Sequence, residues 1–269
     1  MKVLTGISLI VALVANTTSV WANDVHVAVA ANFTKPMESI AADFEKATGN
    51  KIIASFGSSG KLLEQIKHGA PFEVFLSADQ NKPLKAEEEK LDVPGSRFTY
   101  SIGKLVLWSA KEGMVDDKGE VLKTGSFAHI AIANPDTAPY GKAAMETMTK
   151  LGMLETLQPK IVQGDSIAQT KEFISSGNAE LGFVALSQVI KDGKIGTGSG
   201  WLVTDDLYTP MNQDAILLKT GENNAAAQAL MDYLKSDAAK AVIESFGYAL
   251  PETAAPEAEA EATGQADAK

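Results

Sequence analysis

The chain has 269 residues, of which 45% are hydrophobic, with a formal net charge of −10 and no cysteine. This length exceeds the needs of one compact domain and suits two small lobes. The absence of cysteine excludes a disulfide framework, a thiolate zinc site and a cysteine nucleophile. No basic run is present to meet a phosphate backbone, so we expect no nucleic acid partner.

The first 22 residues have the layout of a secretory signal peptide. Lys2 provides a positive start, residues 3–14 are mostly apolar but too short to span a bilayer, and Ala22 ends a plausible cleavage site. Cleavage there would leave Asn23 as the mature N-terminus. No later stretch is long and apolar enough for a membrane span. We therefore expect a soluble periplasmic protein, secreted through a cleaved signal peptide, and we expect it to be a monomer.

Strand-like and helix-like segments then alternate along the chain. Residues 25–30 and 51–56 are β-rich, and residues 72–76 form a third such run. Apolar residues at helical spacing lie between these runs, and the first helix has Pro36 in its opening turn, where proline is tolerated. This alternation predicts an α/β fold with mostly parallel strands, whose ligands bind at the carboxyl ends of the strands.

A long β-rich run at residues 98–108 predicts a crossing into a second lobe. There the alternation repeats, with strands near residues 129–133, 161–162 and 181–184, and a return crossing is expected near residues 208–212. Two crossings make a hinge, and a hinge between α/β lobes makes a cleft. We therefore predict two lobes, the first formed by residues 23–100 and 208–250 and the second by residues 101–207.

The last segment, residues 251–269, has a different composition. It contains five acids, one lysine and no large apolar side chain, so it cannot bury enough surface to offset the entropy lost on ordering. We expect a disordered acidic tail. Without this tail and the predicted signal peptide, the body has a net charge of −7, so any anion must bind against the net charge of the body.

Four strand ends share one design, in which small or polar residues lead into a helix. In the first, Asn32 follows a strand and carries two side-chain donors besides its own N–H. In the second, Ser58 is the expected N-cap, which leaves the N–H and the hydroxyl of Ser59 free. In the third, Pro139 suits the first helical position, which leaves the N–H of Tyr140 free.

In the fourth strand end, Ser166 and Gln169 have capping-box spacing, which leaves the N–H of Ile167 free. Each helix N-terminus carries about half a positive charge, so several aimed at one point can bind an anion without lysine or arginine. Such donors favour a fully ionised dianion, because the hydrogen of a protonated oxyanion needs an acceptor. One such turn alone is ordinary helix capping, and the sequence does not say whether the four meet.

At these same residues the chain resembles the periplasmic molybdate-binding proteins of bacterial molybdate ABC importers, most closely their Azotobacter-type branch. The resemblance implies a two-lobed type II periplasmic binding protein fold that closes on an oxyanion. It also implies capture of molybdate or tungstate and delivery to the membrane permease of an ABC transporter. The matching segments are AANF (30–33), GSSGK (57–61), GAPFEVFLSAD (69–79), GSRFTYSIGKLVLWSAK (95–111), NPDTAPYG (134–141) and LGFVALSQ (181–188).

The resemblance further implies the ligand-binding residues. Asn32 stands where the family has a serine or asparagine that contacts the ion, and Ala31 beside it stands where some relatives have a threonine. Ser59 corresponds to a serine that donates its N–H and hydroxyl. Tyr140 and Ile167 correspond to the two backbone N–H donors of the second lobe. Molybdenum is then bound only as its oxyanion, and no cofactor is implied.

Other functions remain open. Sulfate or another oxyanion is an alternative ligand, because sulfate differs from molybdate chiefly in size. An enzyme that uses the loop at Ser58 and Ser59 is a second alternative, although the nucleophile motif G-x-S-x-G fails at Lys61. A nucleotide-binding loop is excluded, because Leu62 stands where that motif needs serine or threonine. A scaffold or adhesin acting through the acidic tail is the remaining class. We expect no enzymatic activity.

Overall fold

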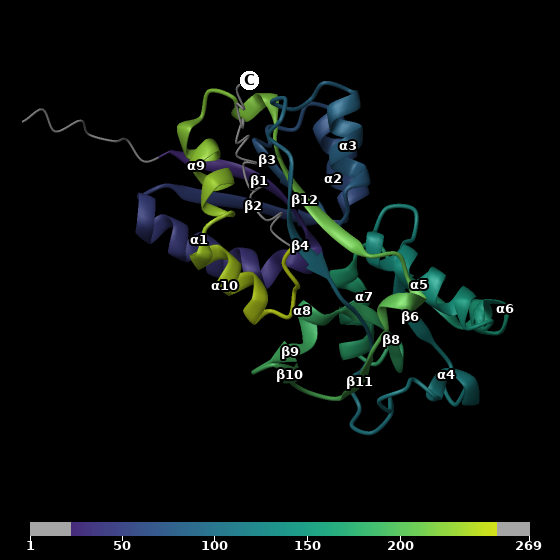
Figure 1. The fold of residues 1–269 in the computed structure, drawn as a ribbon. Helices are drawn as coiled ribbons and strands as arrows, with labels where there is room; N and C mark the ends of the chain where they lie inside the picture. The colour runs from purple at the N-terminus through teal and green to yellow at the C-terminus, as the bar shows by residue number, and fades with distance from the viewer. Residues whose placement is uncertain (1–22, 252–269) are drawn as a thin grey trace, which may run out of the picture.

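The structure, a computed structural model, describes residues 23–251. It contains two five-stranded sheets, each flanked by helices, one in the upper and one in the lower part of the view in Figure 1. The predicted signal peptide at residues 1–22 and residues 252–269 of the predicted tail lie outside the described residues. No helix within the described range is long and apolar enough to cross a membrane.

The first sheet is built from both ends of the described chain. Its strands are β1 (Asp24–Ala30), β2 (Lys51–Gly57), β3 (Val74–Leu76), β4 (Phe98–Gly103) and β12 (Met211–Leu217). The order is β2-β1-β3-β12-β4, in which β1 is parallel to β2 and β3. The flanking helices are α1 (Thr34–Thr48), α2 (Ser59–Lys67), α3 (Asn81–Glu88), α9 (Ala225–Tyr233) and α10 (Asp237–Ser245).

The second sheet comes from the middle of the chain. Its strands are β5 (Leu105–Ser109), β6 (Ile130–Ala133), β7 (Ile161–Gly164), β8 (Leu181–Ala185) and β11 (Ser199–Leu202). The order is β11-β5-β8-β6-β7, in which β6 is parallel to β7 and β8. The helices of this half are α4 (Val121–Thr124), α5 (Pro139–Lys150), α6 (Leu154–Leu157), α7 (Ile167–Ser175) and α8 (Leu186–Val189), followed by the small hairpin of β9 (Ile190–Lys191) and β10 (Lys194–Ile195).

The α/β class is confirmed, but the expectation of mostly parallel strands is wrong. The two main sheets contain four parallel and four antiparallel neighbouring pairs. Every antiparallel pair contains β5 or β12, the strands that receive the chain from the other sheet. Parallel neighbours need a crossover helix on the same sheet, and these two strands have none before them because they arrive through a crossing.

The chain passes between the sheets twice, and the two crossings lie side by side. The predicted run at residues 98–108 is two strands, β4 and β5, separated by Lys104 alone. On the return, the N–H of Val203 donates to the carbonyl of Leu105 at 3.0 Å, and β12 then pairs with β4. We predict that the two lobes move about these crossings. The predicted lobe limits at residues 100, 207 and 250 stay a prediction.

Aromatic packing anchors the segment that joins β1 to α1. The ring of Phe33 is fully buried and stands edge-on to Tyr100, with ring centroids 4.9 Å apart, and to Tyr248, at 5.4 Å. Burial of a phenylalanine side chain contributes roughly 1.5–3 kcal/mol. This packing holds the turn at residues 31–33 in place at the carboxyl end of β1.

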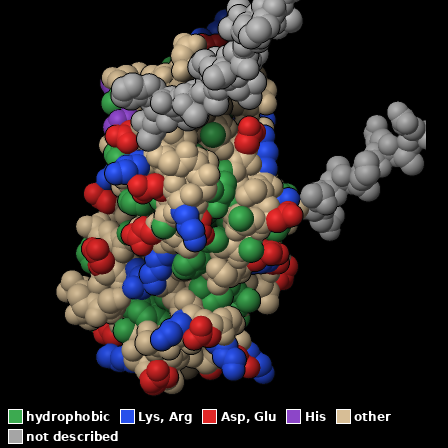
Figure 2. Space-filling model, turned by 90° about the vertical axis from the view of Figure 1, so that its left-hand side faces the viewer, with side chains coloured by type: hydrophobic (Ala, Val, Ile, Leu, Met, Phe, Trp, Pro, Cys, Tyr) green, Lys and Arg blue, Asp and Glu red, His purple; other side chains and the backbone are tan. Residues whose placement is uncertain are grey.

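Acidic and basic side chains are interspersed on the face of the molecule that Figure 2 shows, with hydrophobic side chains between them. The acidic side chains are therefore not gathered into one patch on this face. A mixed surface of this kind adds little long-range field at physiological ionic strength, so local groups decide the electrostatics of a buried site.

Candidate functional site

A small cavity lies between the two halves, where four strand ends meet. All five residues predicted to bind the ligand line it, so the structure brings together the four separate turns. The lining residues are Ala30, Ala31, Asn32, Gly57, Ser58, Ser59 and Ala78 from the first half and Ala138, Pro139, Tyr140 and Ile167 from the second. The cavity offers about 10 Å³ for the centre of a water molecule, roughly what one water needs, so an organic molecule is excluded in this closed arrangement.

The walls of the cavity carry no charge. Among the described residues that line it, none is acidic, basic or a histidine. Most are alanine, glycine or proline, so the polar groups available to a ligand are backbone N–H groups and two serine hydroxyls. Such a wall can bind an anion only through dipoles that are already oriented.

The start of α2 supplies two donors through Ser59. The helix begins at this residue with Ser58 as N-cap, as predicted, and Ser59 is fully buried. Its hydroxyl oxygen accepts a hydrogen bond from the N–H of Ala78 at 2.9 Å. Because that bond occupies a lone pair, the hydroxyl hydrogen remains available to an acceptor in the cavity. No hydrogen bond within residues 23–251 uses the Ser59 N–H.

Ser58 lines the same cavity, although the sequence pattern did not place it among the residues that bind the oxyanion. Its side chain makes no capping hydrogen bond, and its buried hydroxyl has no partner in the described part of the chain. A buried polar group without a partner costs roughly 1–3 kcal/mol, so this hydroxyl is a second candidate donor. The pair of adjacent serines is the signal that points to it, because one serine suffices for capping.

The start of α5 supplies a third donor. Pro139 is the first helical residue and Ala138 the N-cap, as predicted. The N–H groups of the next two residues, Gly141 and Lys142, both bond to the Ala138 carbonyl. None of the hydrogen bonds in the described range uses the Tyr140 N–H, which lies at the first turn of a 12-residue helix. The positive end of that helix therefore faces the cavity.

The start of α7 supplies a fourth donor. Ser166 is the N-cap, and its hydroxyl accepts from the N–H of Gln169 at 3.4 Å. The Gln169 side chain reaches back to the N–H of Asp165 at 2.6 Å, one residue before the N-cap that a capping box would use. These bonds satisfy the turn and leave the Ile167 N–H without a partner in the described structure. Gln188 fixes the turn further by donating to the Ile167 carbonyl at 3.0 Å.

Asn32 lies in the 3-10 turn of residues 31–33 and is 2% exposed. Its side-chain nitrogen donates to the Gln213 carbonyl oxygen at 2.9 Å and to the Tyr248 hydroxyl at 2.8 Å. An amide nitrogen has only two hydrogens, so both side-chain donors that the sequence pointed to are committed within the protein. The donor that Asn32 offers to the cavity is its backbone N–H, and neighbouring Ala31 contributes only a buried methyl wall.

The two halves touch directly at the rim of the cavity. The N–H of Gly60 donates to the carbonyl of Thr137 at 2.9 Å, and Lys61 forms an ion pair with Asp165 at 2.8 Å. A Cβ atom on Gly60 would lie 2.9 Å from the Thr137 Cα, closer than real Cβ contacts. The missing side chain at this position allows the start of α2 to meet the turn before α5.

Several buried tyrosine hydroxyls lie behind the cavity and near the crossing strands. Burial raises the pKa of Tyr100, Tyr140 and Tyr248 well above the usual value of about 10, and the nearby Tyr248 hydroxyl raises the pKa of Tyr100 and Tyr140 further. At the crossing, burial raises the pKa of Tyr208 to about 12. These hydroxyls therefore stay neutral throughout the physiological range.

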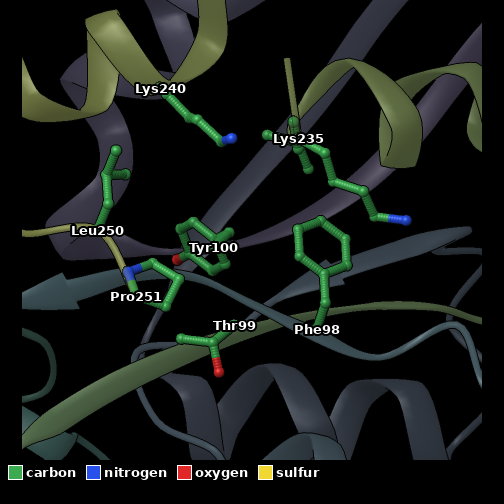
Figure 3. A pocket seen from close by; sticks show the side chains of 8 residues that line it. Phe98, Thr99, Tyr100, Lys235, Lys240, Leu250 and Pro251 are labelled. Carbon is green, nitrogen blue, oxygen red and sulfur yellow. The ribbon is translucent and has the colours of Figure 1, made fainter. Parts of the chain in front are cut away.

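A wider hollow lies outside the cleft, with Phe98 and Tyr100 of β4 on one side and Lys235 and Lys240 on the other (Figure 3). It offers about 410 Å³ by the same measure and ends at Pro251. The Lys235 ammonium lies over the Phe98 ring, 4.7 Å from its centroid. The ammonium groups of Lys235 and Lys240 are partly exposed, and each pairs with an acidic residue three positions before it, so this hollow lacks the unused donors of the cleft cavity.

Comparison with known proteins agrees with this geometry. The family of bacterial extracellular solute-binding proteins matches residues 25–249. Over 229 residues the chain is 60% identical to the molybdate-binding protein ModA of Azotobacter vinelandii, covering 85% of this chain and 91% of the relative. Over 227 residues it is 57% identical to ModA of Rhodobacter capsulatus, covering 84% and 88%. The resemblance found in the sequence is thereby confirmed.

A solved structure supports the same assignment. The Azotobacter vinelandii periplasmic molybdate-binding protein matches with a TM-score of 0.83 at 44% identity, covering 85% of this chain and 100% of that chain. Two α/β halves that close over a cavity lined by helix starts are the arrangement of a protein that encloses a solute. The chain belongs to the family of bacterial extracellular solute-binding proteins.

The substitution Gly60→Ala should weaken ligand binding without destabilising the fold. The added methyl group would push against Thr137, so the halves could not close fully and the donors of the second half would stay too distant. We expect the dissociation constant to rise by about tenfold or more, since one lost hydrogen bond to a charged group costs roughly 1.5–3 kcal/mol. Calorimetric titration with the ligand measures this. The comparison is Lys61→Ala, which removes the exposed ion pair at the same rim without adding a clash and should change affinity by less than about fivefold.

Stability should fall at alkaline pH. The folded pKa values of the buried tyrosines lie above the value of about 10 in the unfolded chain. The stabilisation is therefore complete below about pH 10 and is lost as the pH rises toward the folded values, because the unfolded chain releases these protons first. Urea unfolding between about pH 8 and about pH 11 measures this decline. Tyr208→Phe should show a shallower decline, and a flat profile for the unmodified protein would contradict the prediction.

Proposed function

We propose that this protein captures molybdate, or the near-identical tungstate, in the periplasm and delivers it to the membrane permease of an ABC transporter. The observation that carries the proposal is the small uncharged cavity between the two halves, lined by unused N–H groups and serine hydroxyls. The names of the two relatives described above, molybdate-binding proteins at 60% and 57% identity, support this choice of anion.

The first half would receive the ion. In this mechanism Ser59 donates its N–H and its hydroxyl, Asn32 donates its backbone N–H, and Ala31 shapes the wall beside it. Ser58 adds a hydroxyl that is otherwise without a partner. All these groups sit at the carboxyl ends of β1 and β2, so they are in place before the halves meet. The serine hydroxyl and backbone groups need no change of protonation to bind the ion.

The second half would complete the site on closure. The N–H groups of Tyr140 and Ile167 lie at the first turns of α5 and α7, so each brings the positive end of a helix as well as a hydrogen bond. Together with α2, the N-terminal ends of three helices, each at least nine residues long, converge on the cavity. Their partial charges act over a short distance in a dry cavity, which is how an anion can bind inside a body of net charge −7.

The same donor set determines which oxyanions fit. Molybdate, tungstate and sulfate present only acceptor oxygens at neutral pH, whereas hydrogen phosphate also presents a hydrogen that needs an acceptor. The hydrogen of hydrogen phosphate would face an N–H or O–H group of the cavity instead of an acceptor, so we expect hydrogen phosphate to bind weakly. Sulfate also accepts from these donors but is smaller than molybdate. Selectivity against sulfate therefore depends on whether the two halves can close further until all donors reach the smaller ion.

The arrangement favours binding over catalysis. The Ser59 hydroxyl accepts from Ala78 and has no imidazole or carboxylate beside it in the cavity lining, so nothing there would take its proton as a general base. We propose a monomer without a cofactor. The periplasmic location is part of this proposal, and it rests on the signal-like segment at residues 1–22 and on the solved relative, which is described as periplasmic.

Calorimetric titration with molybdate, tungstate, sulfate and phosphate tests the proposal directly. The mature protein should bind molybdate and tungstate tightly with one ion per chain, and phosphate should give no heat beyond dilution. The buffer must contain no oxyanion. Preferential binding of sulfate would keep the mechanism and change the cargo. Absence of binding to all four ions would overturn the oxyanion proposal.

Ser59→Ala should weaken molybdate binding by about 5- to 150-fold, because it removes a hydroxyl donor to a charged group, worth roughly 1–3 kcal/mol. The exposed Ser176, whose hydroxyl bonds only within its own helix end, provides a control, and Ser176→Ala should leave the affinity unchanged. Unchanged affinity in Ser59→Ala would remove this hydroxyl from the ligand set. Thermal unfolding of both variants without ligand shows whether the loss of the Ala78 bond affects the fold instead.

A further inference from the structure

A buried polar network lies directly behind the cavity and joins its two sides. At its centre is Gln213 of β12, which is fully buried. Its side-chain oxygen accepts from the amide nitrogen of Asn32 at 2.9 Å and from the hydroxyl of Tyr100 at 3.2 Å. Its side-chain nitrogen donates to the hydroxyl of Tyr140 at 3.2 Å. One amide therefore contacts a site residue from each half of the protein.

The Asn32 end of the network is closed into a ring. Asn32 donates to the Tyr248 hydroxyl at 2.8 Å, and Ser187 donates to the Asn32 carbonyl at 2.8 Å. The Tyr248 hydroxyl faces two acceptors, the Asn32 carbonyl at 2.9 Å and the Ser187 hydroxyl at 3.0 Å, and its single hydrogen serves one of them at a time. The ring holds both the side chain and the carbonyl of Asn32, so the turn that carries its N–H has one orientation.

The position of Gln213 is specified by the crossing strands. It lies at the start of β12, just after the return crossing, and is paired with Ser101 of β4. A Cβ atom on neighbouring Gly103 would overlap both the Tyr140 hydroxyl and the Gln213 side-chain nitrogen. Glycine at the end of β4 thus leaves the space in which the two side chains meet. The Gln213 side chain does not line the cavity, so any effect on the ligand must act through other residues.

We propose that Gln213 is a positioning residue of the oxyanion site, which holds the Asn32 turn and the Tyr140 helix start in the relative position at which their N–H groups face one cavity. This inference rests on the proposed function. An amide suits the role because it accepts on one side and donates on the other. A residue with only acceptors or only donors would leave one of the two neighbours unpaired in a buried place.

The proposal also gives the Tyr140 side chain a purpose. Its backbone N–H faces the cavity, whereas its hydroxyl points to the crossing and accepts from Gln213. If only the N–H mattered, Tyr140→Phe would bind normally. Under the proposal, Tyr140→Phe leaves the Gln213 amide hydrogen unpaired in the closed protein and should weaken binding.

Three variants of the mature protein test the role by calorimetric titration with molybdate. Gln213→Met, which has a similar size but cannot bridge the two residues, should raise the dissociation constant by about 5- to 100-fold. Tyr140→Phe should raise it in the same direction. The double variant should bind about as weakly as the single variant with the larger loss, and the rise in its dissociation constant should be smaller than the product of the two single rises. The reason is that both substitutions remove the bond between Gln213 and Tyr140. Independent, multiplicative effects would contradict the proposal.

Ser101→Ala is the matched control. Ser101 is opposite Gln213 on the neighbouring strand and fully buried, and its hydroxyl has no partner among the described residues. Its removal disturbs the same part of the core but none of the hydrogen bonds of the Gln213 side chain, so affinity should not change. An equal loss in Ser101→Ala would mean that any change near the crossing weakens binding, which overturns a specific role for Gln213.

Gln213→Glu adds a readout that a purely structural role would not produce. Its protonated carboxyl group can still accept from Asn32 and donate to Tyr140, whereas the ionised form cannot donate and places a negative charge behind an anion site. Burial raises the pKa of such a carboxyl above its usual value of about 4.3. Affinity of this variant should therefore be close to normal near pH 6 and fall steeply by about pH 8.5.

The unmodified protein should bind equally well across that pH range. Besides the three tyrosines near Gln213, which stay neutral, the nearby charged group is Asp214, which is paired with Arg97 at 2.6 Å. Loss of binding in the unmodified protein would defeat the proposed function, whereas normal binding in every Gln213 variant would defeat only this inference. If Gln213→Met does not fold, Tyr140→Phe removes the same bond from the other side and decides the question.

Discussion

A dianion enclosed in a dry cavity must have its charge balanced, because desolvation of an unpaired charge costs far more than any single contact returns. Here no lysine or arginine lines the cavity, and the body itself is negative. The balance can come only from N–H groups at helix starts, together with the two serine hydroxyls. Every other feature of the site follows from the need to keep these donors unused by the protein and aimed at one point.

Keeping donors unused requires that their neighbours be satisfied elsewhere. Pro139 precedes Tyr140 and has no N–H, Ser166 caps α7 through Gln169, and the Ser59 hydroxyl accepts from Ala78. In each case the neighbouring polar groups have hydrogen-bond partners within the protein, and one donor remains free for the ligand. Small residues complete the design, since alanine and glycine walls let two halves approach until only an ion fits between them.

Aiming the donors is a separate problem, because they come from turns in two distant parts of the chain, Asn32 and Ser59 in one and Tyr140 and Ile167 in the other. The crossing strands bring these turns together, and the buried network around Gln213 relates them across the crossing. A preorganised cavity of this kind binds without first reorienting its dipoles. The protein thus separates two tasks: backbone groups contact the ion, while buried side chains behind them set where those groups lie.

The alternating α/β pattern and the free donors of Ser59, Tyr140 and Ile167 were predictable from the sequence, because capping and proline placement are local effects of neighbouring residues. Ala31 was named only through the resemblance to the family. The mixed direction of the strands was not, since it depends on which sheet each strand joins after a crossing. Local pattern also suggested that the Asn32 amide faces the ligand, whereas the fold places Gln213 and Tyr248 beside it and occupies both hydrogens. By itself, then, the sequence determined which backbone N–H groups the helix starts leave free. Only the tertiary structure decided that they converge, because convergence depends on contacts between residues far apart in the chain.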